Sequence, residues 1–275
     1  MIRQSKVIDN RSGDFQLRTE AAFAWKTAVA ALQDLPGLRG LWTMGSFDSS
    51  GYAYDMSGQG RTLTYTSSSG WPHYGQAGLA PYVDLNGALT FLWRADEAGL
   101  DITGTEAYVE TARMGLTMGC WVYPRLVATQ QCVMGKWNTT SNQRSYNLQL
   151  LAGNVFQADV SSAGTAGTVR SVASTVAVSV NNWYFVCLAF NPSARLAINV
   201  NGTVIAVTSS VPASIHPGTA RFTIGPCNDG ALLPLTGRVS LAFLTCMYYE
   251  ETAPTPVTDR VSQAIFQHTR GLFGV

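Results

Sequence analysis

Hydrophobic and polar residues alternate with a period of two through most of the chain. From residue 38 onward, short segments rich in β-branched and aromatic residues are bounded by glycine, asparagine, proline and serine, a pattern that predicts strands separated by turns. The turns recur about every 8 to 12 residues, which is typical of an all-β sandwich. Within the segment NVNGTVIAV, Asn201 and Gly202 predict a tight hairpin, because both residues tolerate positive φ.

The hydrophobic period becomes helical near the N-terminus. Residues 1–18 are polar and patternless, so we interpret them as an arm. In residues 19–37, Trp25, Val29 and Leu32 fall on one face of a predicted helix. We expect this apolar face to dock the protein on an assembly or to join copies of the chain.

A second helical pattern lies at the other end of the chain. Residues 258–270 predict a helix that Thr258 caps and Gly271 ends. The chain therefore divides into an arm and helix for docking or oligomerisation, residues 1–37, and a β-domain with its C-terminal helix, residues 38–275.

Composition excludes several classes of function. The chain has 275 residues, of which 46% are hydrophobic and 13% charged, and a net charge of +1. With this net charge the chain has no excess of basic residues that could neutralise the phosphates of a nucleic acid. No apolar run is long enough for a membrane span, and the polar N-terminus does not fit a signal peptide. The five cysteines form no C-x-x-C pair, so we expect buried free thiols, or a single bridge that strand pairing could place.

The order of segments resembles the laminin-G-like, concanavalin A-like jelly-roll family. The segments that carry the resemblance span residues 38–273 and include GLWTMGSFDSSGYAYDMSGQGRTLTY, TMGCWVYP, NNWYFVCLAFNPSARLAINVNGTVIA and GRVSLAFLTCMYY. The resemblance implies an all-β jelly-roll sandwich of two antiparallel sheets. It also implies sugar or protein binding at the loop rim or the concave face, and calcium in many members, but it does not imply catalysis.

The segment AYDMSGQGRTLTY, residues 53–65, has three interpretations. A phosphate-binding loop requires a lysine and a following helix, which this segment lacks. The resemblance places Asp55 where many relatives hold calcium, but the second acid of such sites is missing, because Ser240 and Leu241 stand there. The alternative is that Asp55 caps a turn by accepting backbone N–H groups. We therefore expect no cofactor, or calcium bound weakly at Asp55.

No catalytic constellation stands out. The related glucanases carry paired carboxylates on one strand as E-x-D-x-x-E, and no such segment occurs. Asp96, Glu97 and Asp101 are interpreted as solvated or capping groups rather than catalytic ones. The three histidines, His73, His216 and His268, are scattered and adjoin no nucleophile motif. We therefore expect that the protein is not an enzyme.

Aromatic residues near predicted loops are the candidate ligand contacts, because exposed Trp and Tyr form sugar-stacking platforms and interface anchors. The alternative is that they only cover the ends of the sandwich. The polar loop KWNTTSNQRSYN, flanked by aromatic residues, is the first segment to test. The candidate ligand-binding residues are Trp71, Tyr74, Trp137, Asn142 and Tyr146.

These features favour a structural or accessory protein of a bacteriophage or phage-like particle, such as a capsid decoration, tail or fibre component. The alternative is a carbohydrate-binding lectin module acting in adhesion, and a glycoside hydrolase is a third hypothesis. The expected partners are other virion proteins, further copies of the chain and a cell-surface glycan. In the first hypothesis the protein is made in the host cytoplasm and carried in the virion.

Overall fold

A computed structural model describes residues 25–45, 51–66, 73–77, 80–87, 90–105, 114–247 and 260–275, with the side chains of 73–77, 260 and 261 left out. Within these ranges the chain forms two antiparallel β-sheets that pack face to face. The all-β sandwich predicted from the alternating pattern is thereby confirmed. None of the helices in the described ranges is long and apolar enough to cross a membrane.

The first sheet has eight strands in the order β13-β12-β11-β6-β15-β4-β3, and β1 pairs with β15 beside this path. Its longest strands carry nearly unbroken apolar runs, since both of their faces are covered. The strands are β1 (Leu38–Trp42), β3 (His73–Ala77), β4 (Ala80–Asn86), β6 (Met114–Pro124), β11 (Tyr184–Asn191), β12 (Arg195–Val200), β13 (Thr203–Thr208) and β15 (Thr236–Met247).

The second sheet has seven strands in the order β10-β9-β8-β7-β14-β5-β2. Strands β8 and β9 alternate, with apolar residues toward the core and polar residues toward the outside. The strands are β2 (Thr64–Thr66), β5 (Phe91–Arg94), β7 (Gln131–Asn138), β8 (Gln143–Leu150), β9 (Phe156–Ser161), β10 (Val169–Ala173) and β14 (Phe222–Ile224). Among the described connections, three contain short 3-10 helices, at Ala98–Leu100, Ala166–Thr168 and Asn228–Gly230.

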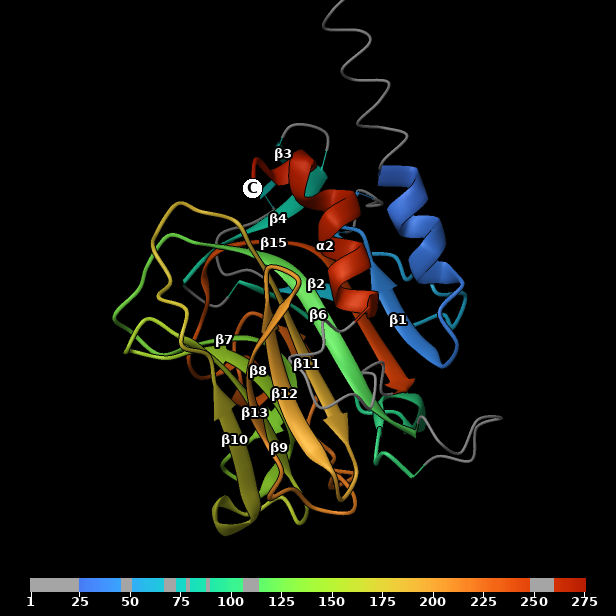
Figure 1. The fold of residues 1–275 in the computed structure, drawn as a ribbon, viewed down its shortest axis with the longest axis vertical. Coiled ribbons are helices and arrows are strands. Elements are labelled where there is room, and N and C mark those ends of the chain that lie inside the picture. The colour runs from blue at the N-terminus through green and yellow to red at the C-terminus, as the bar shows by residue number, and fades with distance from the viewer. Residues whose placement is uncertain are drawn as a thin grey trace, which may run out of the picture.

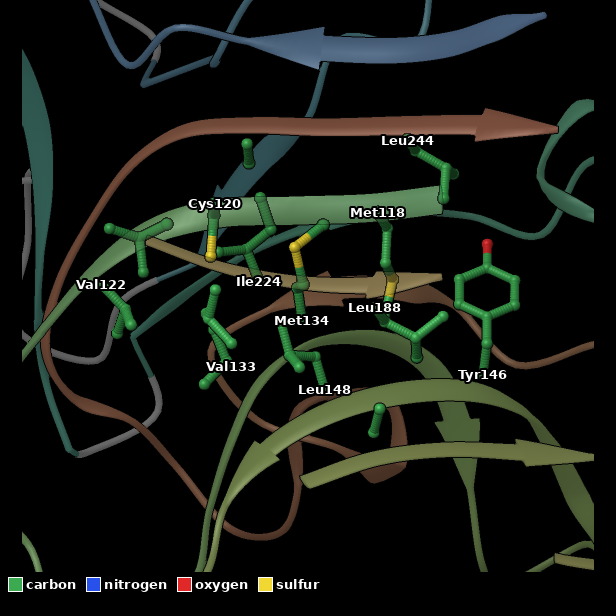
Figure 2. Packing of buried hydrophobic residues seen from close by; sticks show 14 of the residues in the cluster. Met118, Cys120, Val122, Val133, Met134, Tyr146, Leu148, Leu188, Ile224 and Leu244 are labelled. Atoms are coloured by element: carbon green, nitrogen blue, oxygen red, sulfur yellow. The ribbon is translucent and has the colours of Figure 1, made fainter. Parts of the chain in front are cut away.

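The core lies between the two sheets and consists of fully buried apolar side chains (Figure 2). Met118, Cys120 and Leu188 come from the eight-stranded sheet and meet Met134 and Leu148 from the opposite one. Burial of these side chains supplies the main stabilisation of the sandwich.

Two helices cover the outer face of the eight-stranded sheet (Figure 1). The described part of the first covers residues 25–33, and the second is α2 (Arg260–Phe273). In α2, Phe273 stacks on Trp121 of β6 at 4.2 Å between ring centroids. The Trp121 indole N–H also donates to Thr269 at 2.9 Å. Both predicted helices therefore exist and share one sheet face.

These two helices differ from the sequence-based expectations in their packing partner and in their end point. Leu32, predicted to serve assembly, is only 1% exposed and packs on the sheet of its own chain, with Trp25 and Val29 partly buried around it. The apolar face of the first helix is thus largely used within the chain. Helix α2 continues past Gly271 to Phe273, because Leu272 and Phe273 are buried against the sheet.

Local expectations about turns and thiols are confirmed. Asn201 and Gly202 adopt φ of 52° and 77° between β12 and β13, as a two-residue hairpin requires. All five cysteines are buried thiols, and none of them forms a disulfide.

Candidate functional site

The candidate site lies on the outer face of the seven-stranded sheet. The described parts of the two terminal helices cover the outer face of the eight-stranded sheet and do not cover this one. The pairing registers place one residue from each strand in a row across this sheet. Neighbours in a row share a face of the sheet, so their side chains meet. The row reads Thr64, Trp93, Thr223, Gly135, Asn147, Asp159 and Ser171.

Gly135 at the centre of this row makes room for its neighbour. A Cβ at that position would lie 2.6 Å from the carbonyl oxygen of Tyr146 and 3.1 Å from Oδ1 of Asn147. With no side chain there, the amide of Asn147 lies against the strand and is only 1% exposed. The glycine thereby brings polar groups close to the backbone of the sheet.

Strand β7 contains two irregularities of register, between Cys132 and Met134 and between Lys136 and Trp137. Such bulges re-aim side chains beside functional sites. Lys136 is fully buried, and its ammonium bonds to Asp101, Asp96 and the carbonyl of Gly218. The next residue, Trp137, packs with Cys132 and Cys227 on the outer face.

A pocket of about 250 Å³ opens on this face next to Trp137. Its floor comes from strands β8, β9 and β10, and its wall from the segment that follows β14. The lining combines polar and apolar side chains with two charged ones: Gln130, Trp137, Thr139, Arg144, Gln149, Gln157, Asp159, Val169, Ser171, Cys227, Asn228, Leu232 and Leu233.

Asp159 is the centre of the hydrogen bonding in the pocket. Its carboxylate accepts from Gln149 at 2.6 Å, Gln157 at 2.7 Å, Ser171 at 2.6 Å and Asn147 at 3.3 Å. Burial raises the pKa of this carboxyl group, and the four hydrogen bonds partly offset the rise. These hydrogen bonds to Asp159 hold the side-chain amides of Asn147, Gln149 and Gln157 in fixed orientations around the pocket.

The wall is fastened to the sheet by reciprocal side-chain contacts. Asn228 accepts from the backbone N–H of Thr139 at 2.7 Å and donates to the hydroxyl of Thr139 at 2.7 Å. Asn138 donates to Asp229 at 2.7 Å. Asn228 and Asp229 have φ of 51° and 56°, a conformation that Asn and Asp tolerate better than most residues. These contacts fix the position of the pocket wall relative to strand β7.

Two of the predicted ligand-binding residues belong to this region. Trp137 lines the pocket, although only 9% of it is exposed. Asn142 is exposed in the turn before β8 and lies outside the lining, but it accepts from Arg144 at 3.2 Å. Arg144 also donates to the carbonyl of Gly164 at 3.0 Å. Asn142 therefore helps to position a pocket residue.

The other candidates lie elsewhere. Tyr146 is fully buried in the core, where its hydroxyl donates to the carbonyl of Leu100 at 2.9 Å (Figure 2). The expectation that it contacts a ligand at the surface is therefore wrong, because β8 turns this side chain inward. Trp71 lies outside the described residues, and Tyr74 lies on β3, where the structure describes the backbone only.

The carboxylate of Asp55 holds the turn in which it lies. It accepts the backbone N–H groups of Leu41 at 3.0 Å, Ser57 at 2.9 Å and Arg61 at 2.8 Å. These donors direct positive charge toward the oxygens that a cation would use. Among the described residues, no three histidine, cysteine or acidic side chains gather to hold a metal ion.

Asp96, Glu97 and Asp101 are more than solvated groups. Asp96 and Asp101 contact the buried ammonium of Lys136. Glu97 bridges Arg61 at 2.6 Å and Arg94 at 2.9 Å. The interpretation as solvated or capping residues misses these ion pairs, which connect the segment to the sandwich.

The family model for the concanavalin A-like lectin/glucanases superfamily matches residues 95–240. The chain belongs to this superfamily. The matched range contains the whole lining of the pocket. A search of curated proteins finds no match.

Solved structures agree on the fold. The chain is similar to the binding domain of Paraclostridial Mosquitocidal Protein 1, with a TM-score of 0.61 and 12% identity, over 86% of this chain and 52% of that one. The chain thus spans about half the length of that domain. It is also similar to Domain 4 of AbnA, an arabinanase from Geobacillus stearothermophilus solved with arabinotriose, with a TM-score of 0.57 and 13% identity, over 84% of this chain and 98% of that one.

The polar face that forms the pocket is predictable from strands β8 and β9, although the aromatic loops do not indicate it. In β8 the polar residues Asn147 and Gln149 alternate with apolar ones, and in β9 Gln157 and Asp159 do the same. Alternation of this kind predicts one polar face. The same parity places Tyr146 on the apolar side.

Proposed function

We propose that this chain is a non-catalytic carbohydrate-binding domain whose ligand lies in the pocket beside Trp137. The observation that carries the proposal is the fixed set of amides around a buried carboxylate, next to an indole ring. Sugars present hydroxyl groups at their edges and C–H groups on their faces. Such ligands fit sites that combine an aromatic surface with a few oriented polar groups.

The charges of the pocket favour a neutral sugar. Asp159 is the single carboxylate among the lining residues, and Arg144 is the single cation. An anionic ligand would lie close to the buried carboxylate and would be disfavoured. Neutral hydroxyls can instead donate to amide oxygens and accept from Arg144.

The same lining argues for binding without hydrolysis. Glycosidases of the usual type require two carboxyl groups that flank one glycosidic bond. Asp159 stands alone in the lining, and both of its oxygens accept hydrogen bonds from the protein. We therefore propose binding as the activity of this site.

The similar structures support this choice through the fold that they share with the chain. One is a domain of an arabinanase in complex with arabinotriose. Another belongs to botulinum neurotoxin type C, whose cell entry depends on two ganglioside molecules; it has a TM-score of 0.60 and 9% identity, over 87% of this chain and 52% of that one. Both are proteins that engage carbohydrate.

The test is calorimetric titration of neutral oligosaccharides, arabinotriose among them, after a glycan array has selected the strongest ligand. Trp137→Phe and Gln157→Ala are expected to weaken binding about tenfold or more, as interface anchors do. Val207→Ala, on an exposed residue of β13 in the other sheet, should bind like the wild type. Unchanged binding by both pocket variants would refute the site, and turnover of the oligosaccharide would refute the absence of catalysis.

The sequence suggests a setting for this activity, which we propose in addition: display on a bacteriophage or phage-like particle. The polar segment of residues 1–18, ahead of the first helix, is the feature that favours it. Because residues 25–33 pack on the sandwich, the informative deletion removes residues 1–24 only. We expect this deletion to abolish incorporation into particles and association between copies, and unchanged incorporation would contradict the proposal.

A further inference from the structure

Two of the five buried thiols lie side by side under the wall of the pocket. Oδ1 of Asn147 accepts the thiol of Cys132 at 3.0 Å and that of Cys227 at 4.0 Å. Together with Trp137, the two cysteines form one small cluster on the outer face of the seven-stranded sheet. The other three thiols lie in the core and under the terminal helices.

The backbone holds this pair in place from both sides. The N–H of Cys132 donates to the carbonyl of Leu233 at 2.8 Å. Leu232 and Cys227 exchange backbone hydrogen bonds of 2.8 and 3.2 Å. Cys227 therefore belongs to the segment that pairs directly with the start of β7. The two thiols meet in one cluster and approach the same oxygen of Asn147, and a disulfide requires that the two side chains point toward one another in this way.

We propose that Cys132 and Cys227 are an oxidisable pair, which a peroxide converts into a disulfide that fastens the pocket wall to β7. Cys227 is the point of attack because it lines the pocket, whereas Cys132 is completely buried. The peroxide oxidises the Cys227 thiolate to a sulfenic acid and releases hydroxide. The Cys132 sulfur then forms the S–S bond and displaces the sulfenic oxygen, which leaves as water.

Over these two steps the thiols lose two protons and two electrons, and the peroxide is reduced to water. Burial raises the pKa of the Cys132 thiol, and the neighbouring Cys227 raises it further. Since the thiolate is the reactive form, we expect the second step to accelerate with rising pH.

The bond would also change the site. In the reduced protein Asn147 accepts both thiols and donates to Asp159. A disulfide has no S–H donor, so Asn147 would lose these two partners. The oxidised pocket is therefore expected to have a different affinity for its ligand and a wall that opens less readily. The cross-link itself does not depend on what the pocket binds.

Peptide mapping of the full-length protein tests the inference. Each cysteine falls in its own tryptic peptide, with Cys132 in residues 126–136 and Cys227 in residues 222–238. After titration with hydrogen peroxide and alkylation under denaturing conditions, we expect these two peptides to be joined and two of the five thiols to stop reacting. Dithiothreitol should restore all of them. Ligand affinity and Tm should differ between the two forms, with Tm higher in the oxidised one.

Variants separate this result from non-specific oxidation. Cys132→Ser should accumulate a sulfenic acid at Cys227 that dimedone traps, whereas Cys120→Ser should still form the cross-link. The inference is overturned if all five thiols survive peroxide, if Cys227 proceeds to sulfinic acid without the cross-link, or if another cysteine takes part. Because the decisive mapping uses the wild-type chain, a poorly folded variant would not obscure it.

Discussion

Removal of the Asp55 carboxylate tests whether this residue serves the turn or a metal ion. Asp55→Ala takes away the acceptor of three backbone N–H groups, those of Leu41, Ser57 and Arg61. Leu41 is fully buried, so its unpaired N–H costs about 1–3 kcal/mol. The other two groups lie in a partly exposed turn and can bind water, which limits their cost to about 0.5–1 kcal/mol each.

The expected loss in free energy of unfolding for Asp55→Ala is therefore about 2–5 kcal/mol, measured by urea denaturation at constant m. Asp55→Asn keeps the oxygen that serves Leu41 and Ser57 but replaces the one that serves Arg61. It should lose less than half as much. Addition of millimolar calcium should leave the wild-type curve unchanged, because a ligand stabilises only the state that binds it.

Two results would refute this reasoning. A change below about 0.5 kcal/mol for Asp55→Ala would mean that the three hydrogen bonds contribute no more than an ordinary surface contact. Calcium stabilisation of the wild type that disappears in Asp55→Ala would assign the carboxylate to a metal site instead.

Three further predictions concern the seven-stranded sheet. Gly135→Ala should lower the free energy of unfolding by about 1–3 kcal/mol, because its Cβ would meet the carbonyl of Tyr146 at 2.6 Å; Gly153→Ala, with open space around it, is the control, and equal effects would contradict the account. Lys136→Met should cost about 1–3 kcal/mol, since it leaves Asp96 and Asp101 without their buried cation but still 33% and 25% exposed; unchanged stability in urea denaturation would contradict a structural role. Burial raises the pKa of Asp159 above its ordinary 3.8, so ionisation of this carboxyl group opposes folding. The free energy of unfolding of the wild type, relative to that of Asp159→Asn, should therefore fall as pH rises from below 3.8 and level off above the native pKa. A rise over that pH range would mean that the pKa is lowered by folding.

Much of the fold follows from the sequence, because alternation and turn residues act locally. The hairpin at Asn201 and Gly202 is one example, and the helix that carries Leu32 is another. The partner of that helix is not local, however. The apolar face predicted for assembly packs on the chain's own sheet, and periodicity cannot distinguish a neighbour within the chain from one in another copy.

The site is harder to predict, since it depends on pairing between distant strands. Gly135 meets Asn147 and Thr223 only through the registers of β7 with β8 and β14. The bulge at Lys136 and Trp137 changes which face each side chain reaches, and no pattern in the sequence marks it. Tyr146 is predictable from the sequence, because strict alternation along β8 places it with Leu148 in the core.

The most direct test of the central claim is a titration of the labelled protein with its strongest neutral oligosaccharide, followed by nuclear magnetic resonance of the indole and side-chain amide protons. Binding in the proposed pocket predicts that the signals of Trp137, Gln149 and Gln157 shift together and saturate at one equivalent. The indole signals of Trp42 and Trp121, bonded to Arg61 and Thr269 away from the pocket, should stay in place. Saturable shifts confined to residues outside the pocket, or no shifts with any neutral oligosaccharide, would contradict the account.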